Sequence, residues 1–377
     1  MTVALVSLSA CFSNASAPKT TSTTAPARPD VVALVSLIGT GPLLGSGTSL
    51  EGIDLTASSA VAARTIGVGT FPDAVAVSPS GKTAYVVNYT SNTVTPVDLR
   101  TGKVLRAITV GSGPAGIAIT PDGKTAYVTD AGTTPLGDTV TPINLTTDRP
   151  LAPITVGPGP QGIVITPDGT TAYVANAGAI VTGQSGAIGN TVTPIDLRSG
   201  VAGKPITVGN APLALAVSSD GSSLYVANSG SGSVTPVTLA TGAVGAAIPV
   251  TGAPQAIAIS GSTAWVADAS SGIANGNNLT PISLSNDTAG SPVRVGKGLT
   301  AVAITPDGTT AWVVSSGTNS IIPVDLATAV ARTADAVPTG SGPYALALVT
   351  EPRTVAVAAF GPVKVPKAKK TAASPTT

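Results

Sequence analysis

A segment of about 42 residues recurs six times along this chain, each time with the same internal order. The order is Val-Gly-x-Gly-Pro, an alternating apolar run, a Pro-Asp-Gly turn, Tyr-Val-x-Asn and Thr-Val-Thr-Pro-Ile-Asp-Leu. The last position of the first motif is Pro72, Pro114, Pro160, Pro212, Pro254, Leu299 and Pro343, which gives steps of 42, 46, 52, 42, 45 and 44 residues. Steps of this length are typical of β-propeller blades and differ from those of helical repeats.

Composition agrees with an all-β fold. The chain is 43% hydrophobic and 10% charged, and its 43 Gly and 32 Pro disfavour long helices. No change of composition interrupts residues 31–360, so we expect them to form one domain. The 19 basic and 18 acidic residues leave a net charge of +1, which gives no reason to expect a nucleic-acid partner.

One repeat predicts one blade. In the second repeat, residues 116–120 alternate with the period of a strand, and residues 120–123 form a turn in which Pro presets φ and Gly accepts a positive φ. Further strands are expected at residues 125–130, 139–145 and 152–156. Because a single four-stranded sheet is only marginally stable, neighbouring blades must cover its two faces.

The aromatic motif of each repeat identifies a family. It occurs at residues 85–88, 127–130, 173–176 and 225–228, with Trp variants at 265–268 and 312–315. This pattern resembles the YVTN-family β-propeller repeat, and the resemblance covers residues 31–360. It implies a propeller fold but no particular activity, because the family is defined by its repeat.

The two ends of the domain are complementary. After the sixth repeat, residues 344–349 and 354–358 supply only two strands, whereas residues 50–55 and 61–66 align with the third and fourth strands of a blade. We therefore predict a seven-bladed β-propeller of four-stranded antiparallel blades, the last blade shared between N- and C-terminal segments. Residues 31–37 either replace residues 354–358 as its second strand or lie outside it.

Two positions inside the repeat carry structural predictions. The aromatic residue in mid-strand is expected to pack between blades, with its polar atom hydrogen-bonded to a partner. The third strand contains a proline in each repeat, which cannot donate to a ladder, so a short and loosely attached fourth strand is expected beside it. These prolines are Pro96, Pro142, Pro194, Pro236, Pro281 and Pro323.

The termini differ from the repeats. Residues 8–11 resemble a lipoprotein lipobox, which implies that residues 1–11 are the remnant of a lipoprotein signal peptide and that Cys11 is lipidated. The segment departs from the lipoprotein pattern because no basic residue precedes its short apolar run. The alternative is that Cys11 is an unmodified thiol without a function. Residues 12–30 are expected to be a disordered Ser/Thr/Pro/Ala linker and residues 361–377 a basic disordered tail. The protein would then be exported, at the cell envelope or outside the cell, and contact the membrane only through Cys11.

The chain contains no histidine, so Ser-His-Asp, Cys-His and His-metal sites are excluded. The only glutamates are Glu51 and Glu351, and most aspartates lie in turns where they bond local backbone N–H groups. We therefore expect no catalytic residue, no metal and no cofactor.

The loop lengths favour one face of the propeller. Insertions occur at residues 131–138, 177–190, 269–278 and 39–48, all on the face where the second strand turns into the third. Such insertions often carry binding, although unconstrained length drift explains them equally well. The candidate binding residues on this face are Phe71, Asp73, Asn88, Tyr89, Asp130, Asp138, Asn176, Gln184, Asn228, Asp268, Asn275 and Tyr344.

The sequence thus favours a non-enzymatic, monomeric, exported scaffold that binds an unknown protein or glycan on its loop-rich face. The first alternative is a propeller enzyme of the lactonase or dehydrogenase-like type. The second alternative is a passive surface-layer or envelope component.

Overall fold

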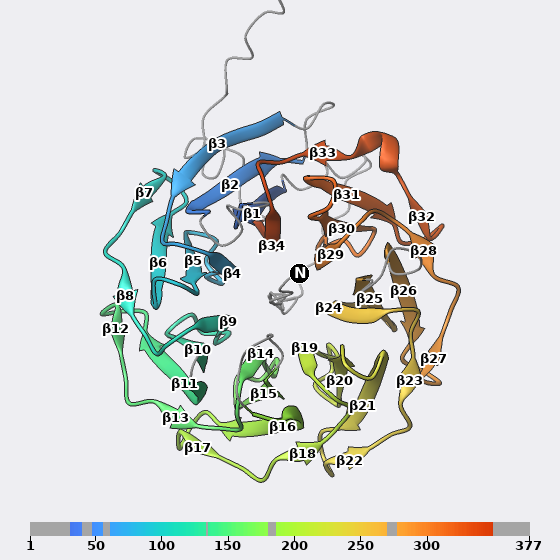
Figure 1. Ribbon diagram of the computed structural model, residues 1–377, viewed down its shortest axis with the longest axis horizontal. Coiled ribbons are helices and arrows are strands. Elements are labelled where there is room, and N and C mark those ends of the chain that lie inside the picture. Colours follow the sequence, from blue (N-terminus) through green and yellow to red (C-terminus); the bar gives the residue numbers. More distant parts are fainter. Residues whose placement is uncertain are drawn as a thin grey trace, which may run out of the picture.

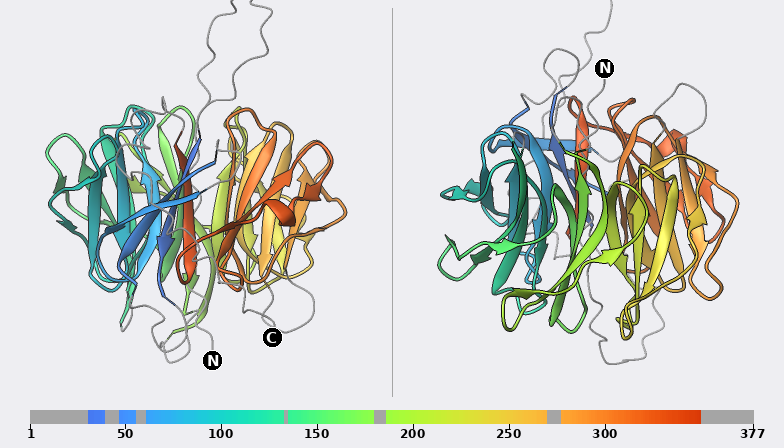
Figure 2. Two further views of the ribbon diagram at one scale, coloured as in Figure 1. Left: turned by 90° about the horizontal axis from the view of Figure 1, so that it is seen from above. Right: turned by 60° about the horizontal axis from the view of Figure 1, so that its bottom comes forward.

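The computed structural model describes residues 31–39, 47–55, 61–132, 135–179, 186–269 and 277–349. They form seven antiparallel sheets around one axis, which confirms the predicted seven-bladed propeller (Figure 1). Seen from the side, the strands run roughly along this axis (Figure 2). Among the described residues, no helix has the length and apolar character needed to cross a bilayer.

Each blade is built outward from the axis. The inner strands are β4 (Pro72–Val77), β9 (Pro114–Ile119), β14 (Pro160–Ile165), β19 (Pro212–Val217), β24 (Ala253–Ser260), β29 (Leu299–Ile304) and β34 (Pro343–Val349). The second strands are β5 (Thr83–Asn88), β10 (Thr125–Gly132), β15 (Thr171–Gly178), β20 (Ser223–Asn228), β25 (Thr263–Ala269), β30 (Thr310–Ser315) and β1 (Val32–Leu37). The third strands are β6 (Thr93–Asp98), β11 (Leu136–Asn144), β16 (Ile188–Asp196), β21 (Ser233–Thr238), β26 (Asn277–Ser283), β31 (Ser320–Asp325) and β2 (Ser49–Asp54).

The fourth strand is broken in six blades. Its fragments are β7 (Lys103–Val104) and β8 (Ile108–Thr109), β12 (Arg149–Pro150) and β13 (Ile154–Thr155), β17 (Val201–Ala202) and β18 (Ile206–Thr207), β22 (Ala243–Val244) and β23 (Ile248–Pro249), β27 (Thr288–Ala289) and β28 (Val293–Arg294), and β32 (Val330–Ala331) and β33 (Val337–Pro338). A short 3-10 helix, η2 (Thr333–Asp335), lies between the last two fragments. The seventh blade instead has one continuous fourth strand, β3 (Val61–Gly67).

Proline causes these breaks, as predicted. In the first blade, β7 pairs with Val97 and Asp98 and β8 pairs with Thr93 and Val94, so the ladder is interrupted beside Pro96. In the seventh blade the corresponding residue is Gly52, and β3 is a single strand there, although its register with β2 shifts between Glu51 and Ile53. The division of the outer strand into two fragments therefore accompanies the prolines, which lack an N–H, whereas the shift in register also occurs without one.

Strands from the first and last parts of the described residues close the ring. The seventh sheet has the order β3-β2-β1-β34, and β1 pairs antiparallel with both β2 and β34 (Figure 1). Residues 32–37 therefore occupy the second-strand position that the sequence left open. Residues 354–358, the other candidates, lie outside the described residues.

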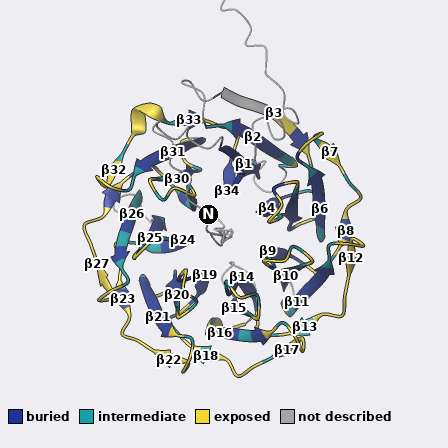
Figure 3. Cartoon of the chain, turned by 180° about the vertical axis from the view of Figure 1, so that it is seen from behind, coloured by how far each residue is buried: buried dark blue, intermediate teal, exposed yellow. Residues whose placement is uncertain are grey.

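The core lies between the blades. Tyr85 of the first blade packs with Ile117, Ala126 and Val128 of the second, and the equivalent aromatic residues are similarly buried. The inter-blade packing predicted for the aromatic position is thus confirmed. One polar atom reaches the next blade directly, since the hydroxyl of Tyr225 donates to Asp287 at 2.7 Å. Figure 3 shows buried inner strands and an exposed outer rim.

Candidate functional site

The inner strands begin with a ring of seven equivalent positions on the loop-rich face. Each follows the Pro72-type residue, and a β-bulge at this point re-aims the side chain, as between Pro72 and Ala74. The ring consists of Asp73, Ala115, Gln161, Leu213, Gln255, Thr300 and Tyr344. Asp73 is its only ionisable carboxyl. The seven positions of the ring therefore differ in chemistry, and the acidic one lies in the first blade.

Asp73 belongs to a cluster that we call the aromatic–acid cluster, consisting of Phe71, Asp73, Tyr89 and Tyr344. The three aromatic side chains pack together with Ile38. The ring centroid of Phe71 lies 5.5 Å from that of Tyr89 and 6.0 Å from that of Tyr344. Because β34 and β4 belong to adjacent blades, the cluster joins the closing blade to the first blade.

The carboxyl of Asp73 is fully buried, at 0% exposure. Among the described residues, no hydrogen-bond donor reaches either of its oxygens. Burial alone raises the pKa of Asp73 well above its usual value. A buried acid without a partner destabilises a fold, so its presence points to a function.

Both tyrosines lie close enough to Asp73 for its negative charge to raise their pKa values. Burial, and then the Asp73 carboxylate, raise the pKa of Tyr89 to about 12. The same two causes, with Tyr89 as a third, raise the pKa of Tyr344 well above its ordinary value. The Tyr89 hydroxyl also donates to the carbonyl of Gly132 at 3.3 Å. Both hydroxyls therefore remain protonated at neutral pH and can donate hydrogen bonds.

The backbone of Phe71 is strained. Its φ is 55°, although bulky residues avoid this region. The equivalent position is glycine in four other blades, as Gly113, Gly159, Gly298 and Gly342, all with positive φ. A phenylalanine here forfeits roughly 1–2 kcal/mol of backbone stability. Ala211, at the equivalent position of the fourth blade, has a φ of 47°, so the positive φ is a property of the repeat and does not by itself mark a site.

Five other predicted residues, Asn88, Asp130, Asn176, Asn228 and Asp268, are buried at equivalent ends of second strands. Their side chains hold the third strand, as when Asn88 donates to Thr95 at 2.8 Å. Four of them also lie against a glycine of the Val-Gly motif, and a Cβ on Gly69 would lie 2.5 Å from the Asn88 side chain. Asp268 instead accepts a hydrogen bond from Thr251 at 3.2 Å. These residues fasten each second strand to its neighbours and do not join the aromatic–acid cluster.

Asp130 and Asp268 should make stability depend on pH. Burial raises the pKa of each to about 6, against the opposing effect of threonine hydroxyls that donate to them. The stability that accompanies their protonation is complete below about pH 4, near the pKa of an unfolded Asp, and is lost as pH rises through 6. Asn occupies the same position in three blades, so the double variant D130N/D268N should fold. Between pH 5 and pH 8 its free energy of unfolding should fall less than that of the wild type, by on the order of 1–2 kcal/mol per site.

Urea unfolding followed by circular dichroism at both pH values measures this difference. Asp73 and Glu51 also have raised pKa values, so the double variant should keep part of the pH dependence. Equal losses of stability in the wild type and the double variant would contradict the assignment.

The remaining predicted residues are dispersed. Asp138 is exposed on β11. Gln184, Asn275 and Cys11 lie outside the described residues. The structure thus brings together four of the predicted residues, Phe71, Asp73, Tyr89 and Tyr344.

Sequence reasoning did not identify the role of Glu51. In the seventh blade Leu37 replaces the strand-end Asn, and the carboxylate of Glu51, 4% exposed, accepts the N–H of Gly340 at 2.9 Å. When residues 50–55 are aligned with residues 94–99, Glu51 takes the position of Thr95. This replacement of a threonine by a carboxyl was the sequence signal that could have pointed to Glu51.

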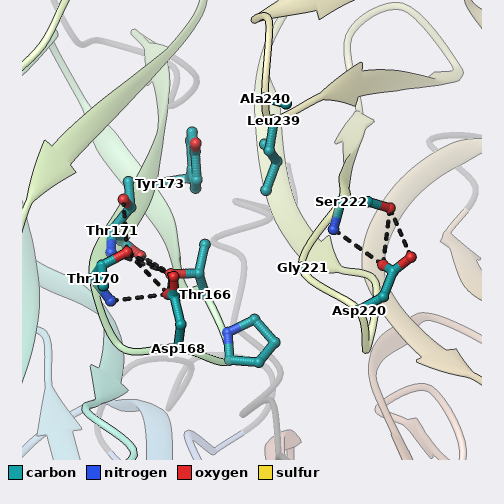
Figure 4. A pocket seen from close by; sticks show the side chains of 11 residues that line it. Thr166, Asp168, Thr170, Thr171, Tyr173, Asp220, Gly221, Ser222, Leu239 and Ala240 are labelled. Carbon is teal, nitrogen blue, oxygen red and sulfur yellow. Dashed lines mark hydrogen bonds between the residues drawn. The ribbon is translucent and has the colours of Figure 1, made fainter.

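A groove of about 560 Å³ on the opposite face separates the turns of the third and fourth blades (Figure 4). It contains Asp168 and Asp220, but each carboxylate is held by its own turn: Thr166 donates to Asp168 at 2.5 Å, and the N–H of Ser222 donates to Asp220 at 3.0 Å. Hydrogen bonds from Ser218 and Ser222 lower the pKa of Asp220 to about 2. Both acids therefore have the structural turn role that the sequence predicted.

Within the described ranges, no three His, Cys, Asp or Glu side chains gather closely enough to hold a metal ion.

No family model and no curated protein sequence matches this chain. Solved structures do match it. A putative 6-phosphogluconolactonase from Bacteroides uniformis has a TM-score of 0.68 at 16% identity, over 85% of this chain and 100% of that one. The periplasmic gluconolactonase of Pseudomonas aeruginosa has a TM-score of 0.67 at 17% identity, over 85% and 100%. Kuenenia stuttgartiensis hydrazine synthase has a TM-score of 0.65 at 23% identity, over 75% and 91%. At these identities the likeness shows the fold.

This comparison corrects the prediction of a non-enzymatic scaffold that binds a protein or glycan. Propellers named as lactonases match the chain along most of its length, so the lactonase-type alternative is better supported. The prediction relied on the absence of histidine, which removes imidazole chemistry only. A buried carboxyl beside tyrosine hydroxyls can still transfer protons, and only the folded chain brings Asp73 next to Tyr344.

Proposed function

We propose that this protein is a propeller hydrolase of the lactonase type, which opens the cyclic ester of a lactone with Asp73 as its proton-transfer group. The observation that carries the proposal is the fully buried carboxyl of Asp73, with neither oxygen hydrogen-bonded to a described residue. The likeness to two propellers named as lactonases selects this reaction among those that a carboxyl can serve.

The chemistry needs one acid–base group. The Asp73 carboxylate takes a proton from water as the water oxygen bonds to the lactone carbonyl carbon. The tetrahedral intermediate then collapses, the bond from that carbon to the ring oxygen breaks, and protonated Asp73 returns the proton to the ring oxygen. Lactone and water give one hydroxy acid, and Asp73 ends as it began. A raised pKa suits both steps, because it makes the carboxylate a stronger base and holds the proton until it is needed.

Tyr344 is suited to stabilise the intermediate. Its raised pKa keeps its proton in place, so its hydroxyl can donate a hydrogen bond to the oxygen that becomes negative, whereas the Tyr89 hydroxyl already donates to the carbonyl of Gly132. Removing one donor of this kind typically lowers kcat by about 10²–10³-fold. Phe71, Tyr89 and Ile38 offer an apolar surface to the carbon face of the lactone ring.

Access to Asp73 requires movement. Phe71, Tyr89 and Tyr344 are each less than 10% exposed, so the cluster is closed in this structure. Rotation of Phe71 or Tyr89 about its side-chain bonds would admit the substrate, and closing the rings again would exclude bulk water from the reaction.

Lactone hydrolysis by the purified protein tests the proposal directly. A pH-stat at about pH 6 records acid release from glucono-δ-lactone and from an aliphatic δ-lactone, each against the same buffer without protein. We expect saturable acceleration of at least one lactone. Acid release at the spontaneous rate for every lactone would overturn the hydrolase proposal.

We further propose that the chain is of the YVTN type and that it is exported and lipid-anchored through Cys11. The Tyr-Val-x-Asn motifs and the lipobox-like residues 8–11 support this. Fatty-acid labelling of the full chain, lost in C11S, is the expected result, and a wild-type protein without label would contradict the anchor.

A further inference from the structure

By sequence, the segments that connect the strands on the loop-rich side carry very few charges. They are residues 38–48, 68–71, 89–92, 110–113, 133–135, 156–159, 179–187, 208–211, 229–232, 250–252, 270–276, 295–298, 316–319 and 339–342. By sequence, Lys297 is the only charged residue in all of these segments. Even the long insertions contain no lysine, arginine, aspartate or glutamate, apart from Asp138 at the edge of one of them.

Lys297 does not lie beside Asp73. It precedes β29, and β34 separates β29 from β4, the strand of Asp73, so the two residues belong to blades that do not touch at the axis (Figure 1). Its ammonium group is on an exposed side chain, while only its backbone is fixed, through Ser315. The region around Asp73 therefore contains an acid and three aromatic rings, with no neighbouring cation in the described part of the chain.

A phosphorylated substrate needs the opposite arrangement. Phosphate sites in proteins use arginine or lysine, or several N–H groups, to balance a charge of up to −2. Here a phosphate would approach a carboxylate in a buried, apolar setting, where repulsion between like charges is weakly screened. An uncharged ring meets no such penalty and can contact Phe71 and Tyr89 through its carbon face.

We infer that the site selects uncharged lactones, such as unphosphorylated aldonolactones, and rejects their phosphorylated counterparts. This inference rests on the proposed hydrolase function and adds the charge class of its substrate. It separates the chain from the activity named for the Bacteroides uniformis propeller, although the two share a fold.

The test compares glucono-δ-lactone with 6-phosphoglucono-δ-lactone under identical conditions, with full-length protein. We expect kcat/KM to be at least about 100-fold higher for the uncharged lactone, which corresponds to roughly 2.7 kcal/mol. K297A should leave the ratio between the two substrates unchanged. T70K, which adds a cation next to Phe71, should raise the relative rate of the phosphorylated lactone about tenfold.

The outcomes are distinct. Equal rates for the two lactones, a preference for the phosphorylated one, or a loss of phosphorylated-lactone activity in K297A would overturn the charge selection and leave the hydrolase standing. Acceleration of neither lactone would overturn the hydrolase, and the inference with it. An unchanged substrate ratio in folded T70K would also count against the electrostatic argument.

Discussion

Replacing Asp73 by asparagine should abolish catalysis and at the same time stabilise the protein. Proton transfer by a placed side chain is typically worth about 10²–10⁴-fold in rate, so D73N should lower kcat for lactone opening by about 10³-fold. Asparagine keeps the volume and polarity of the side chain, but it cannot accept and return a proton. The loss should fall on kcat more than on KM, because the substrate surface of Phe71 and Tyr89 remains.

The gain in stability follows from the same raised pKa. The folded protein binds the Asp73 proton more tightly than the unfolded chain does, so this stabilisation is complete below about pH 4 and is lost as pH rises through the folded pKa. D73N removes that loss. At pH 8 its Tm should exceed that of the wild type by about 2–5 °C, and the difference should shrink toward pH 4. A gain in stability with a loss of activity is expected at a site maintained for function.

D98N is the matched control. Asp98 accepts the N–H groups of Arg100 and Thr101, and Asn144 makes the same two bonds at the equivalent position of the next blade. D98N should therefore leave kcat unchanged in the same assay. If D73N and D98N hydrolysed lactones equally well, Asp73 would not be the proton-transfer group.

Replacing Leu34 by aspartate should prevent stable folding. Leu34 lies at 0% exposure in β1, where it packs with Val75 and Val86 of the first blade. A carboxylate there has no partner and leaves an apolar contact unmade, which places the loss of stability above about 4–5 kcal/mol. The ring magnifies this effect, because β1 lies between β2 and β34 and joins the two ends of the domain.

L151D makes the same chemical change at an exposed site. Leu151 is 50% exposed on the outer rim and should tolerate aspartate within about 0.5 kcal/mol. Urea unfolding and size-exclusion chromatography of both variants give the comparison. A cooperative transition for L34D within 1 kcal/mol of the L151D transition would mean that the closing blade does not stabilise the ring.

Several structural features could be predicted from local chemistry. The period of the repeat gave the blades, and the prolines of the third strand gave the broken outer strands, because a missing N–H acts at its own position. The Asp98-type turns likewise form as expected, since their hydrogen bonds connect residues two or three apart. Each of these predictions depends on neighbours in the chain.

The second strand of the closing blade could not be predicted in the same way. Both residues 31–37 and residues 354–358 have strand-like patterns. The choice of β1 depends on its fit between β2 and β34 and against the first blade, a set of contacts between segments about 300 residues apart. The prediction of a non-enzymatic protein failed for a related reason, because it counted residue types and could not include their surroundings.

The sequence alone determined that this protein is a ring of seven antiparallel blades closed by its own ends, because repeat length, turn residues and strand alternation act locally and agree in every repeat. Only the tertiary structure decided which of the twelve candidate residues lie together. It buried Asp73 without a hydrogen-bond partner among the described residues and set Tyr89 and Tyr344, from two adjacent blades, beside it. Burial and proximity across a blade interface set the proton affinity of a side chain, and neither is encoded in the residues next to it.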